Sequence, residues 1–242
     1  MRKISVILPV YNESACIHKT FDSVLEFLKI NHDYHFIFVN DGSTDNTKEI
    51  IEKKMEQSKT SQITLVTYRT NRGKGYAVKK GLEYGDGDYI CFMDSDLAYS
   101  LAHLEIMVEK LEVFDVVIGC RNLLPNTFKK VKFNRKVAGK VFNTISRKIL
   151  SLKFMDMQAG VKGFKKTVAH DLFKRQTLTG FAFDVEIIYL AKKQGYTIGE
   201  IPAIVSDMHI NKSSKVDLVK DSVSMFCSLL RIKYNEKVGK YE

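Results

Sequence analysis

Two aspartates one residue apart, Asp94 and Asp96, directly follow an apolar run at residues 89–93. Two close carboxylates repel each other, and a cation between or beside them relieves that repulsion. Carboxylate oxygens are hard ligands that suit Mg²⁺ or Mn²⁺, and such an ion completes its shell with phosphate oxygens and water. The pattern therefore predicts a divalent metal site that faces a phosphorylated substrate. The alternative is a pair of exposed loop aspartates.

Two other polar segments also follow apolar runs. Asp41 opens the turn sequence Asp-Gly-Ser, and its carboxylate is suited to accept hydrogen bonds from a base or a ribose. The alternative is a loop in which Asp45 caps the next helix. Residues 71–75, Asn-Arg-Gly-Lys-Gly, place glycines at a helix start, where backbone N–H groups can approach an anion and Arg72 and Lys74 add positive charge. The alternative there is a helix start with solvated lysines.

The apolar runs predict the elements that hold these residues. Short apolar segments predict strands at residues 4–10, 34–39, 63–68, 89–93 and 116–119. Amphipathic segments between them predict helices at residues 14–29, 45–57, 75–85 and 101–111. This alternation indicates an α/β fold with a doubly wound, mostly parallel sheet, and such sheets bind ligands at the carboxyl ends of their strands.

The second half of the chain is less regular. It predicts helices at residues 133–152, 183–194 and 216–233, a loop or short strand at 160–164 and an extended segment at 196–206. We find no internal repeat, low-complexity tract or clear linker. A chain of 242 residues is therefore expected to form one α/β domain.

The amino-acid composition indicates which partners and which cellular compartment suit this chain. The net charge of +10 is typical of proteins that meet nucleic acid, an anionic membrane or a phosphate-rich substrate, and it also occurs as a plain solubility feature. Cys91 and Cys120 lie within apolar runs, and none of the four cysteines has C-x-x-C spacing, which favours a reducing cytosol. No stretch approaches the roughly 20 apolar residues that span a bilayer. We expect a protein that is soluble or lies on a membrane without crossing it.

The motifs together resemble a known family. Residues 9–13 (Pro-Val-Tyr-Asn-Glu), 40–45 (Asn-Asp-Gly-Ser-Thr-Asp), 71–75 and 94–96 are similar, in order and spacing, to the signatures of glycosyltransferase family 2, which has the GT-A fold. Residues 119–121, 156–164 and 180–186 look like the dolichyl- or polyprenyl-phosphate sugar transferases of that family. The resemblance covers about residues 3–215. It implies a nucleotide-sugar-binding half at 1–120, an acceptor-binding half at 121–215, and a C-terminal amphipathic helix and tail at 216–242.

The resemblance also implies a role for each matching residue. The base and ribose would be held by Pro9, Tyr11, Glu13 and Asp41, and the metal and diphosphate by Asp94 and Asp96. Arg72 and Lys74 would help with the diphosphate, while Arg121 and Arg135 would receive the acceptor phosphate. The sugar and acceptor would face Gln158 and either Asp184 or Glu186, and Lys215 would bind the donor.

Two positions depart from the family pattern. Ala98 stands where mannosyl-type members often carry a glutamine metal ligand. His209 stands where such members often carry an arginine. His209 is a candidate metal ligand or diphosphate contact, and the alternative is an exposed loop histidine. These departures bear on the identity of the sugar more than on the class of reaction.

The implied function is inverting, Mg²⁺- or Mn²⁺-dependent transfer of a sugar from a donor of the GDP-mannose or UDP-glucose type to a polyprenyl or dolichyl phosphate. The second hypothesis is a family-2 enzyme with a glycan hydroxyl as acceptor, for which Asp184 or Glu186 is the candidate base.

The third hypothesis is a nucleic-acid-binding module. It lacks a binding signature and leaves Asp94 and Asp96 without a role, so we expect no nucleic-acid partner.

Two segments are candidates for binding a membrane surface. Residues 128–136 mix cations with aromatic side chains, and the last helix carries an apolar face of Val216, Val219, Val223, Phe226 and Leu230. A strongly amphipathic helix with basic flanks suits a membrane interface, and the alternative is a helix packed on the domain's own core. We favour the membrane for residues 128–150 and the core for the last helix. The expected location is cytoplasmic, peripheral at the inner face of the membrane.

Overall fold

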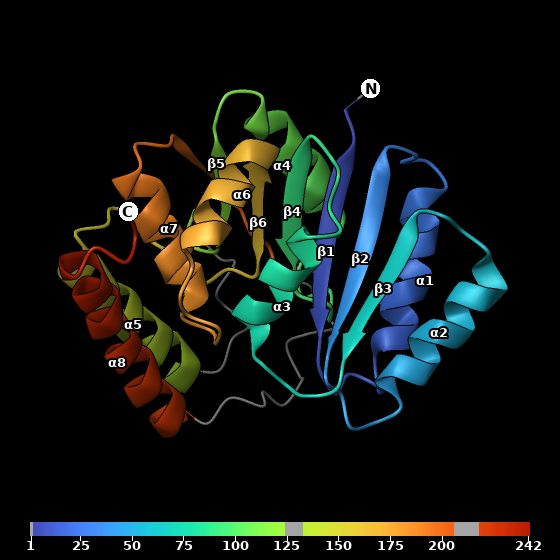
Figure 1. The fold of residues 1–242 in the computed structure, drawn as a ribbon, viewed down its shortest axis with the longest axis horizontal. Helices are drawn as coiled ribbons and strands as arrows, with labels where there is room; N and C mark the ends of the chain where they lie inside the picture. Colours follow the sequence, from blue (N-terminus) through green and yellow to red (C-terminus); the bar gives the residue numbers. More distant parts are fainter. Residues whose placement is uncertain (1, 124–132, 206–217) are drawn as a thin grey trace.

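The fold was taken from a computed structural model, which describes residues 2–123, 133–205 and 218–242. Among the described residues, seven strands form one sheet in the order β3-β2-β1-β4-β6-β5-β7 (Figure 1). The strands are β1 (Ile4–Val10), β2 (Tyr34–Asp41), β3 (Ile63–Tyr68), β4 (Tyr89–Met93), β5 (Val116–Cys120), β6 (Val161–Lys165) and β7 (Ile198–Pro202). Neighbouring strands are parallel except where β6 pairs antiparallel with β4 and β5. The predicted mostly parallel α/β sheet is confirmed.

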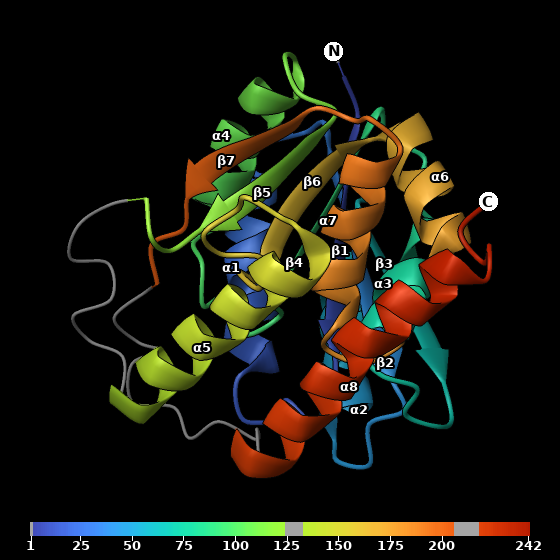
Figure 2. The same ribbon diagram turned by 90° about the vertical axis from the view of Figure 1, so that its left-hand side faces the viewer.

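Helices cover both faces of the sheet. One face packs against α1 (Ile17–Leu28), α2 (Thr47–Ser58) and α4 (Ala102–Leu111). The other packs against α3 (Lys74–Leu82), α6 (Lys166–Arg175) and α7 (Phe183–Lys193), with α5 (Phe133–Leu150) and α8 (Leu218–Lys237) beside them (Figures 1 and 2). Helix α6 was not predicted. Its buried residues are Val168, Ala169, Leu172 and Phe173.

Alternating side chains explain why the strands are apolar throughout. In β1, Val6 and Leu8 join the core beneath α1, whereas Ile7 joins the core beneath α3. Successive residues of a strand point to opposite faces, so a sheet covered on both sides needs apolar residues at nearly every position. Cys91 and Cys120, which lie within the apolar runs of β4 and β5, are buried in the same pattern.

Helix α8 packs on the domain through a face that was not predicted. Leu229 and Ile232 are fully buried, whereas Phe226 and Leu230, from the predicted apolar face, are largely exposed. The helix lies alongside α5 (Figure 2). It therefore contributes to the core and still presents apolar side chains outward. In the described ranges, no helix is long and apolar enough to cross a membrane.

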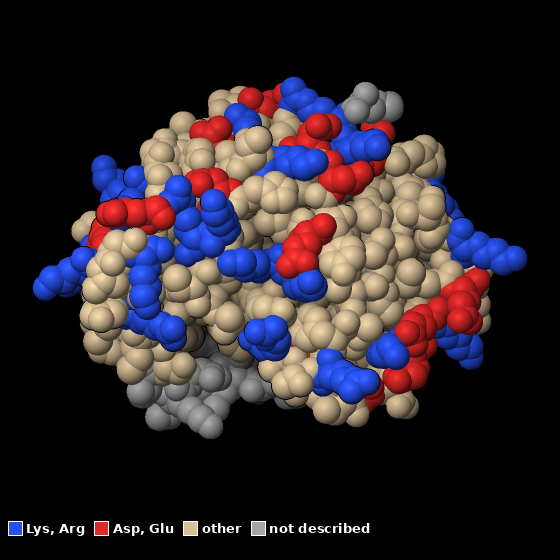
Figure 3. All heavy atoms as spheres, viewed as in Figure 1, with Lys and Arg blue, Asp and Glu red and all other residues tan. Residues whose placement is uncertain are grey.

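Charged side chains are mixed over the face seen in Figure 3. Lysine and arginine side chains alternate there with aspartate and glutamate, and broad uncharged areas separate them. On this face the positive excess therefore does not form a continuous basic stripe of the kind that tracks a nucleic-acid backbone.

The packing of α8 can be tested with two adjacent leucines. Leu229 is 0% exposed and Leu230 is 50% exposed. We expect Leu229→Ala to lower the free energy of unfolding by about 2–5 kcal/mol, because it leaves a cavity. Leu230→Ala should change it by less than about 0.5 kcal/mol. Urea unfolding of both variants measures the difference, and equal losses would contradict the packing described here.

Candidate functional site

The loops that follow β1 and β2 are joined to each other. The Asn12 N–H donates to Ser43 Oγ at 3.0 Å, and the Thr44 N–H donates to Asn12 Oδ1 at 2.8 Å. Asn12 has a positive φ of 51°, a conformation that asparagine tolerates better than most residues. This junction fixes the segment that carries Tyr11 at the carboxyl edge of the sheet, where its ring is partly exposed.

The neighbouring predicted donor residues lie on the same segment. Pro9 is partly buried at the end of β1 and is paired in register with Val39 of β2. The Glu13 carboxylate accepts a hydrogen bond from the Cys16 thiol at 2.9 Å. Pro9, Tyr11 and Glu13 are thus brought to one edge, next to the end of β2.

Asp41 supports the loop between β3 and α3. Its buried carboxylate accepts hydrogen bonds from the N–H groups of Arg72 at 2.7 Å and Gly73 at 2.9 Å, and from the Asn71 side chain at 3.0 Å. Three donors on one carboxylate hold the loop firmly against β2. Asp41 therefore shapes the edge at which a base or ribose is expected.

The start of α3 differs from its prediction. The N–H groups of Gly75 and Tyr76 donate to the carbonyl oxygen of Thr179 at 2.7 and 3.2 Å. With the N–H groups of Arg72 and Gly73 bonded to Asp41, these four amides point into the protein, so the predicted anion-binding role of the backbone here is wrong. The partner, Thr179, is more than a hundred residues away, which local sequence does not reveal.

Arg72 and Lys74 leave this loop in different directions. The Arg72 guanidinium stacks on the Tyr76 ring, 3.8 Å from its centroid, and donates to the Tyr76 hydroxyl at 2.6 Å. Lys74 turns inward, and its Nζ lies 2.7 Å from Asp94 Oδ1 and 3.7 Å from Asp184 Oδ2. Burial alone would lower the pKa of the Lys74 ammonium, but the carboxylates of Asp94 and Asp184 raise it above its ordinary value. The alternative of a solvated lysine is wrong for Lys74.

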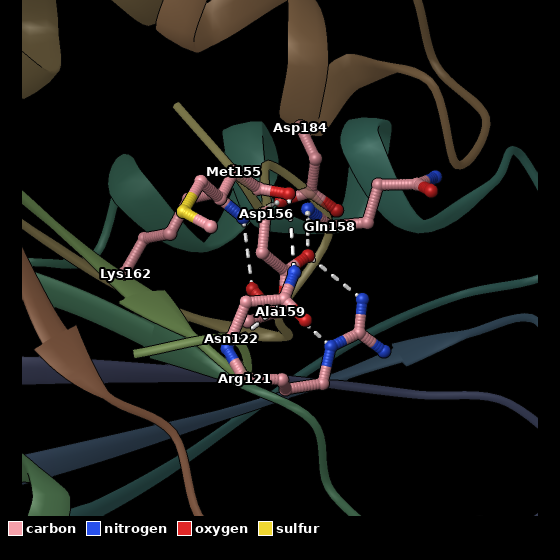
Figure 4. A network of polar contacts seen from close by, with 8 residues as sticks. All are labelled: Arg121, Asn122, Met155, Asp156, Gln158, Ala159, Lys162 and Asp184. Carbon is pink, nitrogen blue, oxygen red and sulfur yellow. Dashed lines mark hydrogen bonds and ion pairs between the residues drawn. The ribbon is translucent and has the colours of Figure 1, made fainter. Parts of the chain in front are cut away.

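A second lysine completes this cluster. Lys162, in β6, is fully buried, and its Nζ donates to Asp184 Oδ1 at 2.6 Å and to the Ala159 carbonyl at 2.9 Å (Figure 4). Burial lowers the pKa of Lys162, and the adjacent Asp184 opposes that effect. Lys162 was not predicted as a site residue. The signal for it is a lysine between Val161 and Gly163, in a short segment whose other inner position, Phe164, is apolar.

Asp94 fits closely against the turn that precedes β6. The Asp94 N–H donates to the Gly160 carbonyl at 2.9 Å. A Cβ atom at Gly160 would lie 1.8 Å from Asp94 Oδ2, so only glycine allows the carboxylate to sit there. Asp96, two residues on, accepts the Ala98 N–H at 3.1 Å. Both aspartates are partly exposed at the carboxyl edge of β4, as predicted from their position.

The chemistry of this carboxylate pair fits a divalent cation. Asp94 already holds a cation, the Lys74 ammonium, against one of its oxygens. Within the described residues, no group of three histidine, cysteine, aspartate or glutamate side chains is placed to bind a metal. Mg²⁺ is commonly bound by one or two carboxylates together with substrate phosphates and water, and Asp94 and Asp96 could supply those carboxylates.

Arg121, at the end of β5, forms a two-pronged ion pair with Asp156. Its Nε lies 2.6 Å from Asp156 Oδ2 and its Nη2 lies 2.8 Å from Oδ1, and the Arg121 N–H also donates to Asp156 (Figure 4). The Gln158 N–H donates to the same carboxylate at 3.2 Å. Burial would raise the pKa of Asp156, but these donors hold it below its ordinary value. The guanidinium stays partly exposed, next to the Asp94 cluster.

Glu186 does not join the Asp94 cluster. Its carboxylate accepts hydrogen bonds from Thr177, from the Leu178 N–H at 2.8 Å and from the Tyr241 hydroxyl at 2.7 Å. Residues two apart on a helix do not share a face, so Asp184 and Glu186 of α7 point in different directions. The geometry makes Glu186 a support of the loop before α7 and removes it as a candidate base.

Three predicted site residues cannot be placed. His209 and Lys215 lie outside the described residues. Arg135 lies in α5, where the backbone is described and this side chain is not.

Comparisons with known proteins agree with this arrangement. The family model described as glycosyl transferase family 2 matches residues 5–173. A dolichyl-phosphate beta-glucosyltransferase of Dictyostelium discoideum is 30% identical over 98% of this chain and 75% of the relative. A Saccharomyces cerevisiae protein of the same description is 29% identical over 98% of this chain and 76% of its own length.

Solved structures match the fold. A glucosyl-3-phosphoglycerate synthase from Mycobacterium tuberculosis in complex with UDP superposes with a TM-score of 0.69 at 20% identity, covering 96% of this chain and 80% of that one. The same enzyme with Mn²⁺, UDP and glucosyl-3-phosphoglycerate gives a TM-score of 0.68 at 20% identity, covering 96% of this chain and 80% of that one. At this identity the likeness concerns the fold, which is the GT-A arrangement.

The Arg121–Asp156 pair predicts a pH-dependent stability. We expect Asp156→Asn to lower the free energy of unfolding by about 3 kcal/mol at pH 7, because it removes the charged partner of a guanidinium whose side chain is 26% exposed. The Asp156 pKa is depressed in the fold, so its contribution is complete above the ordinary aspartate pKa of about 3.9 and is lost as the pH falls below it. Chemical denaturation of wild type and variant between pH 7 and 3 should show the difference shrinking. A constant difference would count against the ion pair as its source.

Proposed function

The chain belongs to glycosyl transferase family 2, and on that premise we propose that it transfers glucose from UDP-glucose to the phosphate of a dolichyl or polyprenyl phosphate. The similarity to dolichyl-phosphate beta-glucosyltransferases supports glucose as the sugar and dolichyl phosphate as the acceptor. The UDP complexes of structurally similar glucosyl-3-phosphoglycerate synthases support the nucleotide. The observation that carries the proposal is the cluster of Asp94, Lys74 and Asp184 at the carboxyl edge of the sheet.

The donor would lie across the ends of β1, β2 and β4. Tyr11 and Glu13 would flank the base and ribose, together with Pro9 and Asp41. Asp94 and Asp96 would hold a Mg²⁺ or Mn²⁺ ion, which stabilises negative charge on the departing nucleoside diphosphate when it is bound. The Lys74 ammonium, 2.7 Å from Asp94 Oδ1, would add a second positive charge at the same place. Gln158, Arg72, Lys215 and His209 complete the proposed donor contacts.

The acceptor would approach Arg121, with Arg135 as its proposed partner. Asp156 binds the Nε and Nη2 side of Arg121 and orients the guanidinium, so the acceptor phosphate would meet the opposite side of the same planar group. The oxygen of a lipid monophosphate is already anionic at neutral pH, so the reaction needs no strong general base. Inversion at the anomeric carbon follows from direct displacement by that oxygen.

The surroundings of Asp184 favour a phosphate acceptor over a hydroxyl. A glycan hydroxyl must lose its proton to a base, and Asp184 is the remaining candidate after Glu186. Lys162 already bonds one Asp184 oxygen at 2.6 Å, and Lys74 lies 3.7 Å from the other. A carboxylate placed between two ammonium groups serves better as their counter-ion than as a proton acceptor.

The reaction can be tested directly. We expect wild type, with Mn²⁺ and labelled UDP-glucose, to transfer glucose to a polyprenyl phosphate, measured as label in the organic phase. Asp96→Asn keeps an oxygen for the Ala98 N–H but removes the charge, so it should lose at least about 100-fold in kcat without unfolding. GDP-mannose and a glycan acceptor serve as comparisons. Label in the glycan and none in the lipid would overturn the proposed acceptor.

We further propose that the protein binds peripherally at the inner face of the membrane through α8. Phe226, Leu230 and Tyr234, spaced four residues apart, are all exposed and share one side of the helix. Arg231 and Lys237 are exposed on the same helix, and each cation near an anionic lipid surface adds about 1 kcal/mol. A lipid acceptor requires such a surface, because its phosphate stays at the membrane interface.

Vesicle sedimentation tests this surface. Wild type should bind vesicles that contain anionic phospholipid, and replacing Phe226, Leu230 and Tyr234 together by serine should weaken binding at least about 10-fold, because the apolar contact is lost. The matched control replaces Ile30 and Val113, which are exposed apolar residues outside α8. Equal losses in both variants would show that α8 is not the binding surface.

A further inference from the structure

Lys162 is a buried cation for which neither the metal nor the acceptor phosphate provides a role. Its side chain is fully buried, and its Nζ lies 5.5 Å from the centroid of the Phe92 ring. Taking an ammonium out of water costs free energy, and well-packed apolar residues often serve stability as well as a buried ion pair. Stability alone therefore gives a weak account of a lysine at this position.

Lys162 reaches the reacting edge by two routes. Through Asp184 Oδ1, at 2.6 Å, it fixes the carboxylate whose other oxygen lies 3.7 Å from Lys74 Nζ. Through the Ala159 carbonyl, at 2.9 Å, it holds the turn before β6 (Figure 4). The next residue of that turn, Gly160, contacts Asp94. Both routes end at Asp94, because Lys74 also bonds that carboxylate.

We propose that Lys162 is a positioning residue for sugar transfer. It holds Asp184 so that Asp184, in turn, holds Lys74 beside Asp94, where the leaving diphosphate gains negative charge. Asp184 then acts as the anchor of Lys74 and does not take a proton. This inference rests on the proposed function, since it assigns Lys162 and Asp184 to the donor side of that reaction.

The experiment compares three variants with wild type in the labelled-glucose assay. Lys162→Met keeps an unbranched side chain of similar volume, one atom shorter, and removes its charge. Lys162→Met/Asp184→Asn removes both charges of the pair, so that no uncompensated carboxylate remains. Lys165→Met, three residues along in the same strand, removes a lysine that pairs with Asp115 at 3.0 Å and is the control.

If Lys162 is a positioning residue, the variants should change kcat and the free energy of unfolding independently. Lys162→Met should lower kcat about 10- to 100-fold, the range expected when a group at a reacting centre is misplaced by about 1 Å. KM for UDP-glucose should change less than kcat. The double variant should regain most of the stability lost in Lys162→Met, because the unpaired charge is gone, yet its kcat should stay low. Lys165→Met should keep the wild-type kcat.

With active wild type, two results would overturn the inference. One is a kcat for folded Lys162→Met within about 3-fold of wild type. The other is recovery of both stability and kcat in the double variant, which would make the lysine purely structural. Wild type itself decides the proposed function, since absence of glucose transfer by wild type overturns that function and this inference with it. Active wild type with unaffected variants overturns only the role of Lys162.

Discussion

The site depends on one reversed strand. In a parallel sheet every strand delivers its carboxyl end to the same edge, whereas β6 runs against β4 and β5 and delivers its amino end there. The turn before β6 thereby meets the end of β4, where Met93 is paired with Val161. Gly160 can then contact Asp94, Asp156 can bond Arg121, and Lys162 can reach Asp184. The turn before β6 enters the site through this pairing, and Asp184 and Thr179 reach it from the segment around the start of α7.

The charged groups at that edge alternate in sign and become steadily more exposed. The side chains of Lys162, Asp184, Lys74 and Asp94 are 0%, 4%, 14% and 34% exposed, in the order in which they contact one another. Each charge has an opposite neighbour, which offsets the cost of its burial. Only the last carboxylate is open enough to meet a substrate. The inner members are fixed before any ligand arrives, so little reorganisation is needed when charge develops.

The sequence predicted the parts of this arrangement that follow from local patterns. Strands β1, β3 and β4 were predicted at their observed bounds, because apolar runs ending in turn residues are local signals. Helix α6 was missed because it follows β6 without a break, although its buried positions have helical spacing. Asp184 and Glu186 were left as alternatives, because their spacing separates them on the predicted helix but does not show which of them faces the site. The Thr179 cap on α3 and the partners of Lys162 depend on contacts between distant segments, which no local pattern contains.

Helix α8 has one face packed in the core and another exposed to solvent. Leu229 and Ile232 fill the core, while Leu230 and Tyr234 face outward from the same turns. Each residue of an α-helix advances by about 100°, so inserting or deleting a single residue before Leu229 would swing the outward side chains toward the core and expose the packed ones. The position of Leu229 along the helix is therefore constrained by the core, whereas the outward positions can take other residue types without loss of that packing.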